Sequence, residues 1–130
     1  MVEVAQLGGN ARFRGLKVLL VEDEVLISFL VEDMLTELGC AAVWHAKGVK
    51  EAMAILREKR PDAAVLDVNL AGEFVYPLAA QLDIARIPFV FATGYGREGI
   101  QPPWGRKPVV QKPYDTHALA SALSSVLVHP

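Results

Sequence analysis

Short apolar runs of strand length alternate along the chain with longer segments in which apolar residues recur at helical spacing. The alternation begins at Leu16 and continues to the end of the chain. Apolar runs of this length are typical of strands buried on both faces, and helices between them allow neighbouring strands to run parallel. The pattern therefore predicts a parallel β-sheet covered by helices on both faces.

Five strands and four clear helices follow from this pattern. We expect strands at residues 17–21, 41–46, 63–66, 89–93 and 109–111. We expect helices at residues 25–38, 49–59, 74–82 and 116–128, the first of them ended by Gly39. The connection from Gly94 to Pro108 contains four glycines and three prolines, so it is unsuited to a regular helix. There we expect one more helix, the fourth in chain order, which is short or irregular.

These elements predict an α/β fold with a doubly wound, five-stranded parallel sheet. The common strand order for such a sheet is 2-1-3-4-5, the flavodoxin-like arrangement. At 130 residues the chain has room for one domain of ordinary size. Residues 1–15 lack the apolar pattern and are expected to form a flexible N-terminal extension. Residues 16–130 are expected to form the domain, with no output domain after it.

The composition is 52% hydrophobic and 22% charged with a net charge of −2, as in folded globular proteins. There is no basic stripe of the kind that neutralises nucleic-acid phosphates. None of the apolar runs approaches the roughly 20 residues needed to span a bilayer. The single cysteine, Cys40, cannot form an internal disulfide, which is typical of cytosolic proteins. We therefore expect a cytoplasmic protein that binds neither nucleic acid nor membrane.

Charged and hydroxyl side chains stand where the predicted strands end. Glu22 and Asp23 end the first strand and Asp67 ends the third. Thr93 ends the fourth, and the fifth runs into Lys112. In an open parallel sheet, ligands bind outside the carboxyl ends of the strands, where the direction of winding reverses. In the order 2-1-3-4-5 the first and third strands flank that point, so the three carboxylates are expected to face one crevice.

Three carboxylates in one crevice limit what the site can hold. Two carboxylates about 5 Å apart repel by roughly 3 kcal/mol at an effective dielectric near 20. Either one pKa rises or a hard divalent cation fills the gap, and oxygen ligands suit Mg²⁺ or Mn²⁺ better than zinc. A carboxylate beside such an ion can attack a phosphoryl donor, while Thr93 and Lys112 are suited to hold phosphoryl oxygens. The residues thus indicate an aspartyl-phosphate site.

Four short motifs resemble those of response-regulator receiver domains, the CheY-like superfamily. The motifs are Val-Glu-Asp-Glu at 21–24, Val-Leu-Asp-Val-Asn-Leu at 65–70, Phe-Ala-Thr-Gly-Tyr at 91–95 and Gln-Lys-Pro-Tyr at 111–114. They occur in the family's order and with fitting spacing, and the resemblance covers about residues 16–128. The resemblance implies that Asp67 is the phosphoacceptor. It implies direct Mg²⁺ ligation by Asp23, by Asp67 and by the Asn69 backbone carbonyl, with Glu22 acting through water.

The resemblance further implies that Thr93 and Lys112 contact the phosphoryl group and that the Lys112–Pro113 peptide bond is cis. The implied partner is a sensor histidine kinase or a phosphotransfer protein. The implied role is that of a stand-alone signalling domain, which assists its own phosphorylation and dephosphorylation but is not an enzyme. As an oligomeric state we expect a monomer or a weak phosphorylation-dependent dimer.

Position 109 departs from the usual receiver pattern. Receivers usually place Tyr or Phe three residues before the lysine, and that aromatic residue turns inward on activation, whereas this chain has Val109. Residues 91–95 instead resemble the FAT GUY receivers, which are linked to kinases of the HWE and related types. In that subgroup the aromatic residue follows the threonine. The resemblance therefore implies a switch made of Thr93 and Tyr95, which repositions the loop behind them.

Two other functions stay open from the sequence. A receiver-like interaction module that works without phosphorylation is motivated by Val109 and by the unusual fourth connection. A small Mg²⁺-dependent phosphohydrolase would also use an aspartate nucleophile, but such enzymes favour Asp-x-Asp after the first strand, whereas Asp67-Val-Asn69 follows the third.

The first helix is broader in apolar character than one core face requires, because Val25, Leu26 and Phe29 add to the inward set. The helix is either well buried or carries a partly exposed apolar patch for the kinase.

Overall fold

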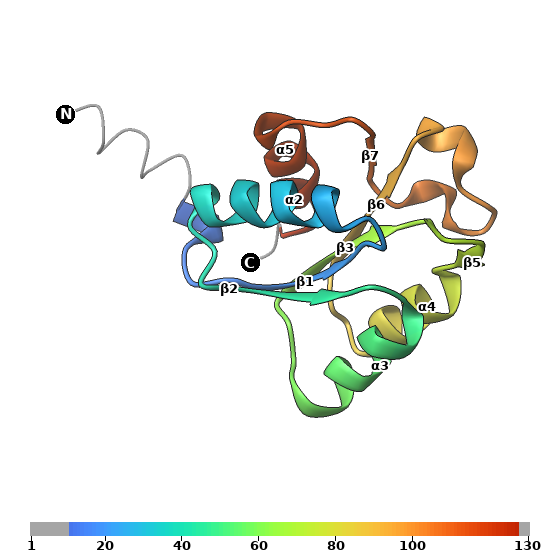
Figure 1. Cartoon of the computed structure of the whole chain (residues 1–130), viewed down its shortest axis with the longest axis horizontal. Helices are drawn as coiled ribbons and strands as arrows, with labels where there is room; N and C mark the ends of the chain where they lie inside the picture. Colours follow the sequence, from blue (N-terminus) through green and yellow to red (C-terminus); the bar gives the residue numbers. More distant parts are fainter. Residues whose placement is uncertain (1–10, 128–130) are drawn as a thin grey trace.

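The computed structural model describes residues 11–127. Its centre is a five-stranded parallel sheet in the order β2-β1-β3-β6-β7 (Figure 1). The strands are β1 (Lys17–Val21), β2 (Ala42–Ala46), β3 (Ala63–Asp67), β6 (Phe89–Thr93) and β7 (Val109–Gln111). Counted along the chain, these are the five predicted strands, and their spatial order is the predicted 2-1-3-4-5. The predicted flavodoxin-like fold is confirmed.

Four α-helices cover the two faces of the sheet. They are α2 (Val25–Leu38), α3 (Val49–Glu58), α4 (Tyr76–Ile84) and α5 (Thr116–Val126). Figure 1 shows α2 and α5 on one face and α3 and α4 on the other. None of the helices within the described part of the chain combines the length and the apolar character needed to cross a bilayer.

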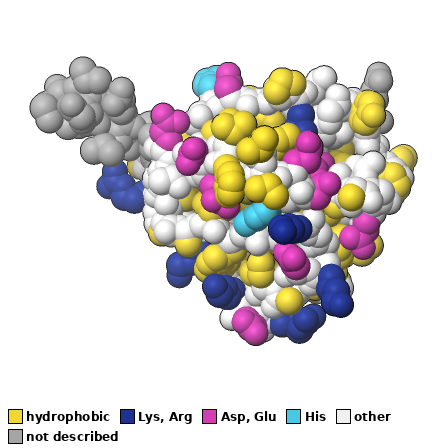
Figure 2. Space-filling model, viewed as in Figure 1, with side chains coloured by type: hydrophobic (Ala, Val, Ile, Leu, Met, Phe, Trp, Pro, Cys, Tyr) yellow, Lys and Arg dark blue, Asp and Glu magenta, His cyan; other side chains and the backbone are white. Residues whose placement is uncertain are grey.

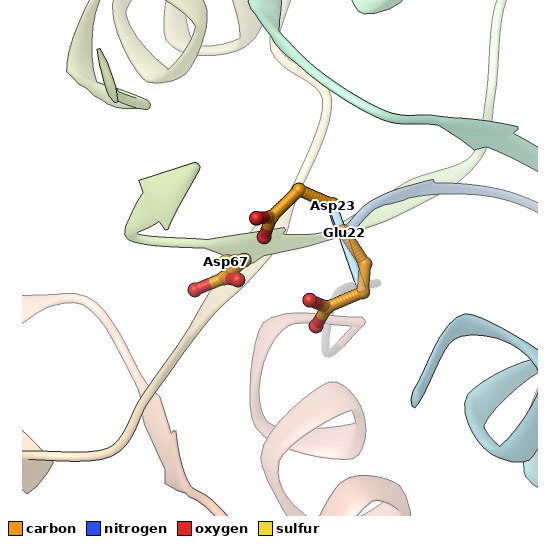
Figure 3. A group of neighbouring side chains, drawn as sticks. All are labelled: Glu22, Asp23 and Asp67. Atoms are coloured by element: carbon orange, nitrogen blue, oxygen red, sulfur yellow. The ribbon is translucent and has the colours of Figure 1, made fainter. Parts of the chain in front are cut away.

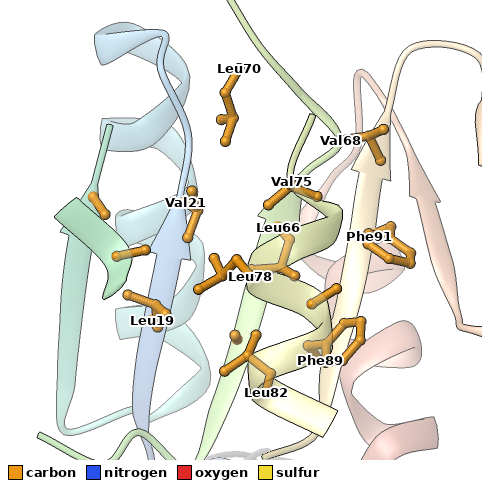
Figure 4. Close-up of a cluster of buried hydrophobic side chains, with 14 of the residues drawn as sticks. Leu19, Val21, Leu66, Val68, Leu70, Val75, Leu78, Leu82, Phe89 and Phe91 are labelled. Carbon is orange, nitrogen blue, oxygen red and sulfur yellow. The ribbon is translucent and has the colours of Figure 1, made fainter. Parts of the chain in front are cut away.

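Alternate residues of each central strand enter two separate cores, because successive side chains of a strand point to opposite faces. Leu19, Leu66 and Phe91 pack against α3 and α4 in the core drawn in Figure 4. Leu20 and Val65 face the other way and pack against α2 and α5. Each fully buried Leu or Phe contributes roughly 1.5–3 kcal/mol. Packing on both faces therefore holds the strands, and with them the residues at their carboxyl ends, in fixed positions.

Two helix boundaries follow from capping. Gly39 has a φ of 109°, and its N–H donates to the carbonyl oxygens of Leu35 and Thr36, which ends α2 as predicted. Asp115 caps α5 by accepting a hydrogen bond of 2.8 Å from the N–H of Ala118. Because Asp115 lies three residues after Lys112, this cap also fixes the chain just beyond the site. The Lys112–Pro113 bond is cis, as predicted.

The third connection differs from its prediction. Asn69–Leu70 (β4) and Glu73–Phe74 (β5) form a small antiparallel hairpin, so the helix expected at 74–82 begins two residues later, at Tyr76. The tight turn has Ala71 at φ 55° and Gly72 at φ 93°. Pro77 in the first turn of α4 marks the observed helix start, since proline is favoured there.

The fourth connection has no α-helix among its described residues, 94–108. It contains two short 3₁₀ helices, η2 (Gly96–Gly99) and η3 (Trp104–Arg106). The expectation of a short or irregular element is confirmed. Pro102–Pro103 in this connection is a second cis peptide bond.

The described part of the predicted N-terminal extension packs onto the domain. Residues Ala11–Phe13 form a 3₁₀ helix, and Phe13 is buried in the core under α2 and α5. The N–H of Gly15 donates to the carbonyl oxygen of Gly39 at 3.3 Å. For residues 11–15 this corrects the expectation of a loose extension, because a single buried aromatic ring anchors the segment. Residues 1–10, and residue 128 of the predicted last helix, lie outside the described residues.

Candidate functional site

The carboxyl ends of four parallel strands meet at one edge of the sheet. Glu22 and Asp23 follow β1, Asp67 and Thr93 are the last residues of β3 and β6, and Lys112 follows β7. Backbone hydrogen bonds continue beyond the strands: the N–H of Glu22 donates to Ala46 at 3.0 Å, and the N–H of Lys112 donates to Thr93 at 2.8 Å. The sheet therefore extends just far enough to fix the residues that carry the polar side chains.

Glu22, Asp23 and Asp67 form a cluster of three carboxylates (Figure 3). One oxygen from each lies within 4.8 Å of the others, as the topology predicts. Glu22 and Asp67 are buried, with 1% and 6% of their surfaces exposed, and Asp23 is partly exposed. The site thus has a buried floor of two acids and one acid nearer to solvent.

Lys112 lies against the two buried acids. Its Nζ is 2.9 Å from Oε1 of Glu22 and 3.1 Å from Oδ2 of Asp67. Within residues 11–127, Lys112 is the one cation that pairs with the cluster, and it pairs with Glu22 and Asp67 but not with Asp23. One ammonium therefore faces three carboxylates.

This shortage of positive charge shifts pKa values in the cluster. Burial, together with the charge of Glu22, raises the pKa of Asp67 to about 7, and Lys112 offsets only part of the increase. Burial alone would lower the pKa of Lys112, but its hydrogen bonds and the charges of Glu22 and Asp67 outweigh burial and raise it. A hard divalent cation among these oxygen ligands would relieve the repulsion. The donor set fits Mg²⁺ or Mn²⁺ by its chemistry.

Asn69 and Thr93 lie beside Asp67. The backbone N–H of Asn69 donates to Oδ1 of Asp67 at 3.4 Å. The side-chain oxygen of Asn69 accepts a hydrogen bond of 2.8 Å from Gly72, so it serves the β4–β5 turn. Only the backbone of Asn69 thus remains for the metal role predicted for it.

Thr93 is buried, and its Oγ1 accepts a hydrogen bond of 3.1 Å from the N–H of Tyr95. The Tyr95 side chain is 79% exposed and does not fill an internal position. The cluster opens into a cleft of about 590 Å³. Its lining includes Asp23, Asp67, Asn69, Thr93, Tyr95 and Lys112. Asp67 and Lys112 therefore line one open cleft together with Asp23 and Thr93.

Two further side chains near the site do not belong to the predicted set. His45 is half-buried, and its Nε2 lies 2.7 Å from the carbonyl oxygen of Glu22. The signal was its position on β2, directly beside the end of β1. Tyr114 has a buried hydroxyl without a hydrogen-bond partner among the described residues. Burial and the charges of Glu22 and Asp67 raise the pKa of Tyr114.

Comparisons with known proteins agree with this geometry. The chain matches the family described as the response regulator receiver domain over residues 18–124. The solution structure of SdrG from Sphingomonas melonis Fr1 is 38% identical, with a TM-score of 0.75, and the match covers 88% of this chain and 98% of SdrG. A BeF₃-activated conformation of SdrG, from Pseudomonas melonis Fr1, gives the same identity and TM-score over 86% and 96% of the two chains.

Two longer relatives match over about half of their length. The anti-anti-sigma factor PhyR from Bartonella quintana is 27% identical with a TM-score of 0.77, and the match covers 92% of this chain and 50% of PhyR. The uncharacterized transcriptional regulatory protein YbdJ from Bacillus subtilis (strain 168) is 27% identical over 123 residues, which are 89% of this chain and 52% of YbdJ. The chain belongs to the response regulator receiver domain family, whose members are signalling domains of two-component systems and not enzymes.

Proposed function

We propose that this domain accepts a phosphoryl group on Asp67 in a reaction that needs Mg²⁺ or Mn²⁺. The observation that carries the proposal is the cluster of three carboxylates faced by the single ammonium of Lys112. Asp23, Asp67 and the Asn69 backbone carbonyl would hold the cation, and Glu22 would act through water. When bound, the cation supplies positive charge to a transferring phosphoryl group.

The side chains of the site support an in-line transfer to Asp67. A carboxylate oxygen of Asp67 forms the new O–P bond while the P–N bond of a donor phosphohistidine breaks, and the electron pair of that bond stays on the imidazole nitrogen. Lys112 already lies 3.1 Å from Oδ2 of Asp67, so it is placed to neutralise a phosphoryl oxygen. The Thr93 hydroxyl can donate to another phosphoryl oxygen from the neighbouring strand end.

Small phosphodonors test this function. With acetyl phosphate and Mg²⁺, the intact mass of the protein is expected to increase by one phosphoryl group, and a chelator is expected to prevent the increase. No increase in mass, or an equal increase with the chelator, would contradict the proposal. The first of these results would favour an interaction module that works without phosphorylation.

We also propose that a histidine kinase or phosphotransfer protein docks on α2. The helix is not fully buried: Val25, Leu26, Phe29 and Leu30 are between 46% and 77% exposed. Hydrophobic side chains gather over this helix on the face shown in Figure 2. The apolar patch begins two residues after Asp23, so a protein bound there would place its phosphohistidine near the cleft. Since such donors act in the cytoplasm, we propose that location for this chain.

Leu26→Ser is expected to slow phosphotransfer from a phosphorylated kinase domain by about tenfold, since Leu26 is the most exposed apolar side chain of the patch and a few residues carry most of the binding energy of an interface. Labelling by acetyl phosphate is expected to stay unchanged, because Leu26 is not part of the cleft. Ile84→Ser is the matched control, since Ile84 is 75% exposed and lies on α4, on the other face of the sheet. The rate is followed as loss of label from the kinase. Equal slowing in both variants, or none in Leu26→Ser, would contradict docking on α2.

A further inference from the structure

Tyr76, the first residue of α4, holds the fourth connection against the domain. Its hydroxyl accepts a hydrogen bond of 2.9 Å from the N–H of Gln101 and donates to the carbonyl oxygen of Gly99 at 3.5 Å. The two partners lie on either side of Ile100, which is buried in the core. The phenol hydroxyl of Tyr76 therefore joins α4 to the segment that leaves the end of β6.

The ring of Tyr76 makes a second contact with the same connection. It stacks on Trp104 with a centroid distance of 6.2 Å and an interplanar angle of 9°, and it meets Phe91 of β6 edge-on at 5.8 Å. Stacked and edge-on pairs contribute beyond their buried area. Residues 94–108 form only 3₁₀ turns, so their position depends on such side-chain contacts more than on internal helical hydrogen bonds.

Gly99 links this arrangement to Thr93. A Cβ added to Gly99 would lie 2.8 Å from Oγ1 of Thr93 and 3.0 Å from Cβ of Tyr95. The absence of a side chain at position 99 therefore lets the segment close directly over the Thr93 hydroxyl. The same hydroxyl accepts a hydrogen bond from the N–H of Tyr95. Thr93 thus accepts a hydrogen bond from one residue of the connection that Tyr76 fixes and lies close to another, Gly99.

We propose that Tyr76 is a positioning residue that acts through Gly99 to hold Thr93 in its resting position. We call Tyr76, Gly99, Gln101 and Trp104 the Tyr76 clamp. The proposal rests on the proposed function of Asp67 and names the regulation of that site. When Thr93 turns its hydroxyl toward a phosphoryl group on Asp67, it gives up the hydrogen bond from Tyr95 and moves away from Gly99. The contacts of Tyr76 with Gly99, Gln101 and Trp104 then weaken, and residues 99–104 change position in response to phosphorylation.

If the Tyr76 clamp stabilises the resting arrangement, weakening it is expected to increase the affinity for a phosphoryl analogue. Interactions made only in the resting arrangement lower the apparent affinity for any ligand that binds the other arrangement. Tyr76→Phe keeps the ring and its stacking but removes both hydrogen bonds of the hydroxyl. It is expected to raise the apparent affinity for beryllofluoride, a phosphoryl analogue, by about three- to tenfold, the range expected for lost hydrogen bonds. A purely structural role would leave this affinity unchanged.

Gly99→Ala provides an independent variant, because its added methyl group meets Thr93 rather than Tyr76. It is expected to shift the affinity in the same direction, since the Cβ crowds the resting position of the Thr93 hydroxyl. Gly105→Ala is the matched control in the same connection, because a Cβ there has no atom within 4 Å. This control is expected to bind beryllofluoride as the parent protein does.

The experiment titrates beryllofluoride in the presence of Mg²⁺ and follows the fluorescence of Trp104 in a Trp44→Phe background. We expect a change in fluorescence on binding and tighter binding in both Tyr76→Phe and Gly99→Ala. If the parent binds beryllofluoride but the two variants bind with unchanged or weaker affinity, the clamp is overturned while the function of Asp67 stands. If the parent neither binds beryllofluoride nor accepts a phosphoryl group from acetyl phosphate, the proposed function fails and the clamp fails with it.

Discussion

Asp67→Asn is expected to abolish labelling by acetyl phosphate completely. The amide has nearly the shape of the carboxylate, but it lacks the nucleophilic oxygen and the charge that would hold a cation. The fold is expected to survive the change, since Lys112 keeps its ion pair of 2.9 Å with Glu22. The measurement is intact mass after incubation with acetyl phosphate and Mg²⁺.

Asp33→Asn is the control for this prediction. Asp33 is an exposed acid on α2 and does not line the cleft. The Asp33→Asn protein is expected to gain one phosphoryl group at the parent rate. If Asp67→Asn were labelled as fully as the parent protein, another residue would be the phosphoacceptor, and the proposed role of Asp67 would be wrong.

Asp23→Asn is expected to change stability and metal binding in opposite directions. In the metal-free protein it removes one of three carboxylates whose oxygens lie within 4.8 Å of each other. The full repulsion between two charges at such a distance is about 3 kcal/mol, and partial exposure of Asp23 reduces it. We expect the free energy of unfolding to rise by about 1 kcal/mol, which raises Tm by about 3 °C in a domain of this size. Affinity for Mg²⁺ is expected to fall at least about tenfold.

The measurement for Asp23→Asn is thermal unfolding with and without Mg²⁺, since a cation that binds only the folded state raises Tm according to its affinity. Asp33→Asn is again the control: Asp33 is an exposed acid that neither belongs to the three-carboxylate cluster nor lines the cleft. Mg²⁺ is expected to stabilise the parent and Asp33→Asn proteins alike. If Mg²⁺ stabilised the Asp23→Asn protein as strongly as the parent, the proposed metal site would be wrong.

The sheet could be predicted because each strand is marked in the sequence both by a short apolar run and by the polar or turn-forming residues that flank it. The strands at 17–21, 89–93 and 109–111 are observed with their predicted bounds, since each is a short apolar run between polar or glycine- and proline-rich segments. The first helix ends where Gly39 can adopt a positive φ. These features depend on neighbouring residues only, and the parallel order then follows from topology.

The third connection could not be predicted in the same way. The β4–β5 hairpin has only two residues in each strand, which is too short for an alternating pattern. Its turn uses Ala71 at φ 55°, a conformation that alanine seldom adopts. Pro77 was the available signal for the true start of α4. Phe13 was missed for a related reason, since a single apolar residue in a polar segment has no periodicity.

The candidate site could be predicted as a set of residues but not as a set of contacts. Strand ends bring Glu22, Asp67 and Thr93 together whatever their side chains do. The pairing of Lys112 with both buried acids depends on side-chain packing between residues far apart in sequence, and the closeness of Gly99 to Thr93 depends on the path of an irregular connection. Neither feature could be predicted from the sequence.

Chemical trapping of an acyl phosphate identifies the residue that carries the phosphoryl group. The protein is phosphorylated with acetyl phosphate and Mg²⁺, treated with borohydride, which reduces an acyl phosphate to an alcohol, digested, and sequenced by tandem mass spectrometry. We expect the reduced residue to be Asp67. Reduction at Glu22, at Asp23 or at any other carboxylate, or a phosphoryl group found on a histidine, would contradict it.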